Sequence, residues 1–248
     1  MTLAMTARVD TLEAALAPVS ALVDECKVRF DADGISIRAV DPANVAMVDM
    51  TLDEAGLESL VADEGVIGVD LDRLEDVIGM GGSDDLVSLE LDAETRKLHI
   101  QIDDLSYTLA LIDPDSIRQE PDIPDLELPA TAAMEGQHLL RGFSAADLVA
   151  DRVRIRGDPG AEAVVIAAEG DTDDVELTLG ADELVSADVP EAADSLFSLN
   201  YLTDMGVPIP DDVIVTLRFG TEFPVKFRYQ AADHVSVENM LAPRVESS

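Results

Sequence analysis

The sequence predicts an α+β protein made of two similar domains, each an antiparallel sheet that carries two helices. Segments of alternating apolar and polar residues, typical of half-buried strands, recur along the whole chain. The order of elements also repeats, because residues 71–76 match 199–204 at an offset of 128 and residues 98–102 match 225–229 at an offset of 127. We expect the helices to cover one face of each sheet and to leave the other exposed.

The first copy should begin with a helix within residues 11–23, where apolar residues recur at helical spacing and Pro18 kinks or interrupts the helix. A hairpin is predicted within residues 27–40, around the turn at Asp33 and Gly34. The remaining elements of this copy are, in order, a strand at 45–52, a strand end followed by a short helix and a glycine stop within 68–81, two strands within 85–102 and a strand at 107–112.

The second copy repeats this order after residue 131. Its predicted elements are a helix within 136–151, strands at 152–157, 163–169 and 174–179, a short helix within 198–206, and paired strands at 212–219 and 223–230. Arg152, Arg154 and Arg156 lie on one face of the first of these strands. Because no aromatic residues alternate with them, we interpret them as a solvated face that balances nearby acids, not as a nucleic-acid platform.

A proline-rich segment, residues 116–131, separates the copies. Pro121, Pro124 and Pro129 fix the backbone and remove hydrogen-bond donors, so this stretch is predicted to be neither helix nor central strand. We therefore divide the chain into a first domain at 1–113, a connector at 114–130 and a second domain at 131–248.

The charge of the chain is extreme: 52 acidic residues against 16 basic ones give a net charge of −36. An acidic excess indicates either a binder of basic partners or a host cytoplasm of molar salt, where self-repulsion is screened over about 3 Å. The acids are spread through every segment instead of forming a tail, which favours the halophilic interpretation. An apolar share of 47% is enough to build a core.

No motif predicts an enzyme, a metal site or a cofactor. The acidic turns at 31–34 and 170–174 lack the spacing of a calcium loop, and the glycines at 79–82 lack the lysine of a phosphate loop. The three histidines are scattered, and Cys26 is expected to be a buried filler. With neither a signal peptide nor an apolar stretch long enough to span a membrane, we expect a soluble, cytoplasmic protein with no membrane contact.

Four segments resemble the sliding clamp of archaeal and eukaryotic replication, proliferating cell nuclear antigen (PCNA). They are residues 34–52, with an Asp-x-x-x-Val loop, and residues 68–78, 197–205 and 239–246, the last with Leu-Ala-Pro before a basic residue. The resemblance covers essentially the whole chain. It implies a homotrimeric ring that encircles double-stranded DNA with weak direct contact, catalyses nothing, and tethers DNA polymerase, clamp loader, flap nuclease and ligase through short peptide motifs.

In that family the connector, one loop and the C-terminal segment wall a pocket for partner peptides. Proline pre-extends the connector, so a docking partner orders less of it. Carried over to this sequence, the pocket residues are Val40, Asn44, Val45, Met47, Ile117, Ile123, Pro224, Met240, Leu241, Ala242, Pro243 and Val245. The alternative is that Val45, Met47 and Leu241 are plain core and that the connector is an ordinary linker.

The resemblance also assigns the contact between subunits to two edge strands. Unpaired strand edges invite aggregation, which head-to-tail pairing prevents. The residues expected to meet are Tyr107, Leu109 and Leu111 of one subunit and Val175, Leu177 and Leu179 of its neighbour. The alternative is that these two segments pair within one chain.

The helices expected to face DNA carry few bases here, and the plausible DNA-facing residues are Arg8, Arg73 and Arg141, with Arg141 the best matched. Molar salt would remove much of the DNA affinity that phosphate contacts provide, since this affinity falls steeply with salt. A closed ring, in contrast, is held on DNA by topology. Two other functions stay open from the residues alone: an acidic protein-binding module without a ring, and a metal-dependent nuclease that uses paired carboxylates.

Overall fold

The computed structural model describes residues 1–120 and 126–245. By its internal contacts the chain forms two compact units. The first consists of Met1–Pro121 together with Gln230–Val237, and the second of Asp122–Tyr229 together with Glu238–Ser248. The first unit extends beyond residue 113, the predicted end of the first domain. The connector boundaries at 114 and 130 therefore stay a prediction.

The first unit contains two antiparallel sheets and two helices. One sheet has the order β5-β1-β7-β8-β9, and the strands β4-β3-β2-β6 are neighbours in the other. Its elements are β1 (Leu3–Arg8), α1 (Val9–Ser20), β2 (Glu25–Asp31), β3 (Gly34–Val40), β4 (Ala46–Asp53), a 3-10 turn (Glu54–Gly56), β5 (Ser59–Ala62), β6 (Gly65–Asp70), α2 (Leu71–Ile78), β7 (Leu86–Asp92), β8 (Lys97–Ile102), β9 (Leu105–Ala110) and a 3-10 turn (Pro114–Ser116).

The second unit repeats this arrangement. The strands β14-β10-β16-β17 are neighbours in one sheet, and β13-β12-β11-β15 form the other. Its elements are β10 (Ala130–Glu135), α3 (Gly136–Asp147), β11 (Arg152–Asp158), β12 (Ala163–Glu169), β13 (Asp174–Leu179), β14 (Leu184–Asp188), β15 (Ala193–Ser198), α4 (Leu199–Gly206), β16 (Ile214–Phe219), β17 (Val225–Ala232) and β18 (Val235–Leu241). The start of β18 counts with the first unit.

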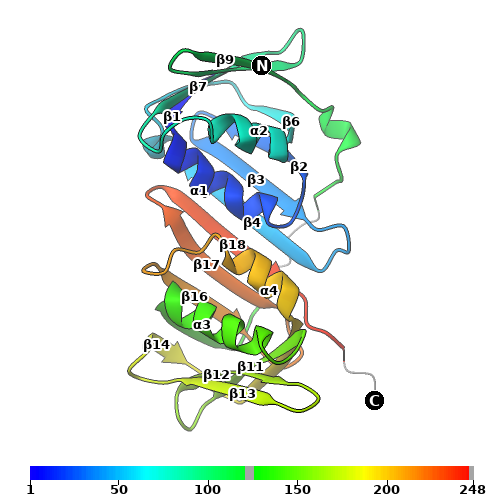
Figure 1. Ribbon diagram of the computed structural model, residues 1–248, viewed down its shortest axis with the longest axis vertical. Helices are drawn as coiled ribbons and strands as arrows, with labels where there is room; N and C mark the ends of the chain where they lie inside the picture. The colour runs from blue at the N-terminus through cyan, green and yellow to red at the C-terminus, as the bar shows by residue number, and fades with distance from the viewer. Residues whose placement is uncertain (121–125, 246–248) are drawn as a thin grey trace. The chain divides into compact units, whose positions relative to one another are not determined.

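The helices lie on one face of the strands of their own unit, as predicted. Figure 1 shows α1 and α2 side by side in the first unit and α3 and α4 side by side in the second, and each pair is in contact. The apolar stripe of α1, including Leu12, Leu16 and Val19, is buried, whereas Asp10 and Glu13 are exposed or nearly so. A helix and a sheet that each have one apolar face form a stable layer by burying those faces against each other.

The internal repeat is confirmed in detail. Helices α1 and α3 each have 12 residues and begin at Val9 and Gly136, an offset of 136 − 9 = 127. Helices α2 and α4 each have 8 residues and begin at Leu71 and Leu199, an offset of 199 − 71 = 128. The predicted hairpin within residues 27–40 is also present, since β2 pairs antiparallel with β3 and Asp31 faces Gly34. Gly34 has φ of +140°, and a Cβ there would lie 2.2 Å from the Leu52 carbonyl oxygen, so the turn requires glycine.

Three features differ from the expectations. Pro18 lies inside the last turn of α1. It does not interrupt the helix, which continues past it and ends two residues later at Ser20. The edge strand expected at 107–112 is shifted to Leu105–Ala110. Several strands that pattern reading did not identify are present, namely β1, β5, β10, β14, β15 and β18. Of these, β10 is rich in alanine and methionine, which carry little strand preference.

Candidate functional site: a buried aspartate turn and the start of the connector

The turn between β3 and β4 is organised by one buried carboxylate. Asp41 is 2% exposed, and its Oδ1 accepts hydrogen bonds from the backbone N–H groups of Val45 at 2.7 Å and Ala46 at 2.8 Å. Its Oδ2 accepts from the N–H of Ala43 at 2.8 Å. A buried carboxylate is tolerated only when its oxygens are satisfied, and here the backbone of its own turn satisfies them. Asp41 therefore fixes the shape of the turn.

Asn44, at the tip of this turn, adopts the left-handed backbone conformation with φ of +60°. Asparagine adopts this region more readily than most residues, because its short polar side chain can bond locally. Its side chain is exposed, and Val45 beside it is half-buried. The turn thus presents Asn44 and Val45 at the surface in one defined conformation.

Ile112 and the beginning of the connector that follows it are attached to the first unit at four points. Ile112 forms an isolated antiparallel bridge with Gly68, and the buried Ile117 lies over the same glycine, where an added Cβ would meet its Cδ1 at 2.7 Å. Arg118 donates from Nη1 to the carbonyl oxygens of Pro42 at 2.8 Å and Asp41 at 3.2 Å. Glu120 forms an ion pair with Arg29 at 3.0 Å.

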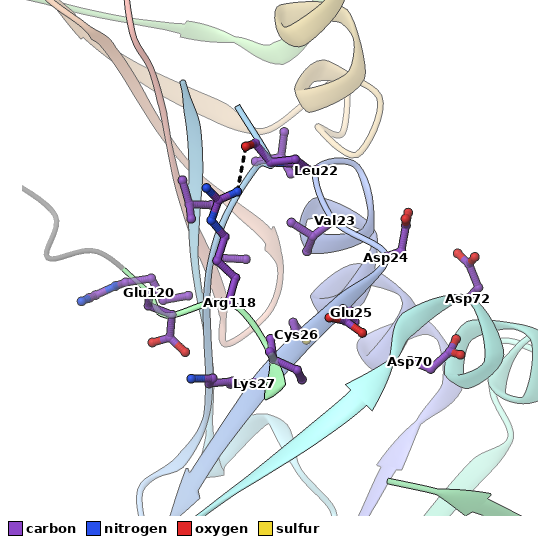
Figure 2. Close-up of a pocket in the computed structure, with 15 residues that line it drawn as sticks. Leu22, Val23, Asp24, Glu25, Cys26, Lys27, Asp70, Asp72, Arg118 and Glu120 are labelled. Atoms are coloured by element: carbon purple, nitrogen blue, oxygen red, sulfur yellow. Dashed lines mark hydrogen bonds between the residues drawn. The ribbon is translucent and has the colours of Figure 1, made fainter. Parts of the chain in front are cut away.

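A cavity of about 550 Å³ lies beneath this part of the connector, within the first unit. Figure 2 shows Arg118 on one side of it, bonded to a backbone carbonyl, and Asp24, Asp70 and Asp72 on the other side. Glu120 also lines it; burial raises the pKa of this carboxyl, and its Oε1 accepts no hydrogen bond from the described residues. The floor includes Cys26, whose pKa burial raises to about 12, so this thiol is a protonated core residue and not a nucleophile.

The predicted pocket residues fall into two groups. In the first unit Val40, Met47 and Ile117 are buried, Val45 is half-buried and Asn44 is exposed. In the second unit Leu241 is buried, Pro224, Met240, Ala242 and Pro243 are half-buried, and Val245 is 93% exposed. Ile123 lies outside the described residues. Whether the two groups form one pocket stays a prediction, but the buried members can contribute shape more than contact area.

The C-terminal segment of the second unit is extended along β15. The N–H of Arg244 donates to the carbonyl oxygen of Leu196 at 2.7 Å, so the Ala242–Pro243 pair is held in place on both sides. Neither residue carries a polar side chain, and both are half-buried. This part of the predicted pocket therefore offers an apolar surface of fixed shape.

Both predicted interface strands lie at sheet edges. Strand β9 ends the first unit's five-stranded sheet and β13 ends the second unit's four-stranded sheet. The alternative that they pair within the chain is wrong, because β9 pairs with β8 and β13 pairs with β12. Leu109 and Leu179 are each 1% exposed and pack inside their own units. The side chains that remain accessible are Tyr107, Leu111, Val175 and Leu177.

The three candidate DNA-facing arginines are not equivalent. Arg8 donates to Asp10 at 3.0 Å and also to Asp84, and its hydrogen bonds hold the pKa of Asp10 below the ordinary value. Arg73 forms an ion pair with Asp70 at 3.3 Å. Arg141 on α3 is exposed and makes no ion pair or hydrogen bond with any residue that the structure describes. Among the three candidates, Arg141 thus offers a positive charge that no described residue compensates.

Other candidate sites have ordinary roles. Arg154 pairs with Asp194 at 2.9 Å and Arg156 with Glu176, which agrees with the interpretation of that strand as a charge-balanced face. Within residues 1–120 and 126–245, no three His, Cys, Asp or Glu side chains come together in a way that could hold a metal ion. A search of the described helices for one long and apolar enough to cross a membrane finds none.

Comparison with known proteins decides the family. The profile of the proliferating cell nuclear antigen N-terminal domain matches residues 6–116. The DNA polymerase sliding clamp of Natronomonas pharaonis is 56% identical over 241 residues, which cover 96% of this chain and 96% of the relative. The chain belongs to the PCNA family of DNA polymerase sliding clamps. A second such clamp, from Halobacterium salinarum, is 55% identical over 96% of this chain and 97% of its own length.

Solved PCNA structures agree with this assignment. A structure described as the C-terminal region of FEN-1 bound to A. fulgidus PCNA matches with a TM-score of 0.93 and 35% identity, covering 99% of this chain and 100% of the other. PCNA from Thermococcus kodakaraensis matches with a TM-score of 0.89 and 28% identity over 98% of this chain and all of its own. The clamp fold inferred from the sequence is confirmed, and the haloarchaeal PCNA relatives fit the halophilic interpretation of the charge.

Sequence reasoning missed the residues that organise this site. Asp41 begins the Asp-x-x-x-Val loop that carries the family resemblance, yet its three bonds to backbone N–H groups were not anticipated. An aspartate followed by proline and asparagine at a strand end is a turn signal that could have identified it. Arg118 and Glu120 gave no such signal, because their partners lie 76 or more residues away in the chain.

Proposed function

We propose that this chain is one subunit of a homotrimeric ring that encircles duplex DNA and tethers replication and repair enzymes to it. The observation that carries the proposal is membership of the PCNA family together with two accessible sheet edges at β9 and β13. The ring acts as a processivity factor and has no catalytic activity of its own. It works in the cytoplasm, where haloarchaeal DNA is replicated at high salt.

The internal repeat supports head-to-tail assembly. Strand β4 in the first unit corresponds to β13 in the second at an offset of 174 − 46 = 128, and β9 corresponds to β18 at 235 − 105 = 130. The start of β18, which counts with the first unit, lies beside β4 in the sheet order. Pairing β13 of one subunit with β9 of the next would repeat this strand neighbourhood between chains. Such a heterologous contact gives a closed ring when its rotation closes.

Partner enzymes would dock through short peptides on the surface around the Asp41 turn and the connector. The A. fulgidus relative is described with the C-terminal region of FEN-1, a flap nuclease, bound to it. In this chain the exposed Asn44, the half-buried Val45 and the apolar C-terminal segment supply matching surfaces. Polymerase, clamp loader and ligase would compete for the same predicted pocket.

Retention on DNA would depend on enclosure more than on affinity. The exposed side chains of α1 and α2 are mostly acidic, and Arg8 and Arg73 are neutralised by neighbouring carboxylates. At molar salt each phosphate contact contributes little, because the counterions it would release are already abundant in solution. A closed ring remains on DNA even when its phosphate contacts are weak.

The mass in solution tests the ring. In about 2 M potassium chloride, where charges separated by more than about 3 Å are screened, multi-angle light scattering should give three times the chain mass of 26.5 kDa. Tyr107→Glu, on the β9 edge, should yield monomers. Val61→Glu is the matched control, since Val61 lies exposed on β5 at the opposite edge of the same sheet and should leave the trimer intact.

A monomer of the unaltered chain at high salt would contradict the ring and favour an acidic binding module. Equal disruption by both substitutions would mean that assembly does not use the β9 edge specifically. Cleavage of phosphodiester bonds by the pure protein with added divalent metal would contradict the proposal that it is not an enzyme.

A further inference from the structure

We infer that Arg118 is a positioning residue for partner-peptide binding: it couples the connector to the Asp41 turn, residues 41–46, and holds Asn44 and Val45 in the conformation that receives a peptide. This inference rests on the proposed function. It assigns to Arg118 a role that is distinct from walling the groove, since its guanidinium is directed at the backbone of the turn (Figure 2).

The geometry gives the turn two independent restraints. From inside, Asp41 binds three backbone N–H groups of residues 43–46. From outside, Arg118 binds the carbonyl oxygen of Pro42 and that of Asp41, which also accepts the N–H of Asn44 at 3.1 Å. Donors and acceptors of the same short segment are thereby fixed by two different side chains. Only the second restraint belongs to the connector.

The chemistry suits arginine and a salty solvent. Both bonds come from the single Nη1 of Arg118, which the rigid guanidinium plane holds in place, whereas a lysine presents a point charge on a flexible stem. Neutral carbonyl acceptors also make this contact less sensitive to ionic screening than an ion pair between two exposed side chains. The neighbouring ion pair of Glu120 with Arg29 has one exposed member, since Arg29 is 47% and Glu120 only 12% exposed, so high salt should weaken it in part, while the Arg118 contact should persist.

The position of Arg118 links the two sides of the predicted groove. Its neighbour Ile117 is buried at 7% exposure over Gly68, so the backbone at 117–118 cannot shift without disturbing the core. The turn is therefore bonded to a part of the connector that Ile117 anchors in the core. A preordered turn loses less conformational freedom when a peptide docks, which is how such a contact raises affinity without touching the ligand.

The test uses the full-length trimer and a synthetic peptide of the C-terminal region of FEN-1, titrated calorimetrically in 2 M potassium chloride. We expect Arg118→Ala to raise the Kd about fivefold, the effect of losing roughly one net hydrogen bond, and Arg118→Lys to restore part of the affinity. Amide hydrogen exchange across residues 41–46 should accelerate in the alanine variant. The trimer mass should not change.

The matched control is Arg96→Ala. Arg96 is likewise an exposed arginine bonded to the connector region, to Asp113 at 2.8 Å, but it does not contact the Asp41 turn. Its removal should leave the Kd and the exchange of residues 41–46 unchanged. A Kd that rises equally in both variants would overturn the inference, because connector attachment in general would then explain the loss.

The outcomes separate this inference from the proposed function. If the unaltered trimer binds no peptide, the proposed docking function fails. If it binds and Arg118→Ala binds equally well, the proposed function stands and the positioning role is wrong. A lower unfolding temperature of Arg118→Ala with an unchanged Kd would likewise reduce Arg118 to a structural residue.

Discussion

The two units share one fold but fill their cores differently. Five of the six phenylalanines, all except Phe30, lie in the second unit, where Phe197, Phe219 and Phe227 are fully buried. The largest fully buried side chains of the first unit are aliphatic or methionine, such as Met50, Leu71 and Ile100. Helix lengths and repeat offsets are nevertheless nearly identical. The pattern of burial, more than the identity of the core residues, determines this architecture.

The units also differ at corresponding turns. Residue 41, the first after β3, is the buried Asp41, whereas residue 170, the first after β12, is Gly170. In the second unit the turn closes by a backbone bond from the N–H of Gly170 to the carbonyl oxygen of Asp173 at 2.9 Å. Among the described residues, the carboxylate that bonds three backbone N–H groups lies in the first unit, and the predicted partner site lies next to it. The two copies therefore differ next to the predicted partner site.

The largest expected effect tests the difference between the cores. Ile100 and Phe227 are equivalent at an offset of 127, and both are at most 2% exposed. Phe227→Ala should lower the free energy of unfolding by about 4 kcal/mol and Ile100→Ala by about 3 kcal/mol, because the larger side chain leaves the larger cavity. Guanidinium-induced unfolding, with potassium chloride held constant, measures both. A greater loss for Ile100→Ala would mean that the first core collapses less readily around a cavity.

The next effect tests the difference between the turns. Asp41→Ala leaves three backbone N–H groups without their acceptor and should cost about 2 kcal/mol in the free energy of unfolding. Asp41→Asn keeps one carbonyl oxygen and should recover about half of that loss. Chemical unfolding monitored by circular dichroism gives the comparison. An unchanged midpoint for Asp41→Ala would show that solvent replaces the carboxylate at no cost.

A smaller effect tests the difference between the helix surfaces. Each phosphate contact that is lost should change the slope of log K against log salt by about 0.9. Arg141→Ala should reduce the slope for duplex DNA, because Arg141 has no competing carboxylate among the described residues, whereas Arg8→Ala should leave it unchanged. Fluorescence anisotropy across a potassium chloride series measures the slope. Equal slopes for the two variants would show that Arg141 contributes no more to phosphate contact than Arg8 does.

The smallest effect concerns a carboxyl that the second unit lacks, since Glu75 corresponds to Thr203 at an offset of 128. Burial raises the pKa of Glu75, and a hydrogen bond of 2.9 Å from Ser20 only partly opposes this. A folded pKa above the unfolded one means that the ionised form is penalised in the folded state. The penalty is present above the folded pKa and disappears as the pH falls below the unfolded value.

Glu75→Gln should therefore raise the unfolding temperature by about 1 °C at pH 7 and by nothing near pH 4. Differential scanning calorimetry at the two pH values measures this. Thr203→Ser in the second unit is the control and should show no pH-dependent difference. A gain for Glu75→Gln that persists at pH 4 would assign the effect to something other than ionisation.

Strand alternation and the offset repeat were sufficient to predict most of the fold, because both reflect local periodicity. Pattern reading failed for β10, which is in contact with α3 and whose alanines and methionine carry no strand signal of their own. The family resemblance supplied the residues around Asn44 and Val45 but not the bonds that shape their turn. The predicted interface strands were located at true edges, yet burial removed Leu109 and Leu179 from the accessible surface.

The sequence by itself determined the doubled architecture, the proline-rich connector and the halophilic charge, because these follow from composition and short-range pattern. Only the tertiary structure decided which charged side chains matter. Of 52 acids, Asp41 is distinguished by burial, and of the candidate arginines Arg8 is neutralised by Asp84, 76 residues away. Such pairings depend on which distant segments the fold brings together, and neither spacing nor composition records that.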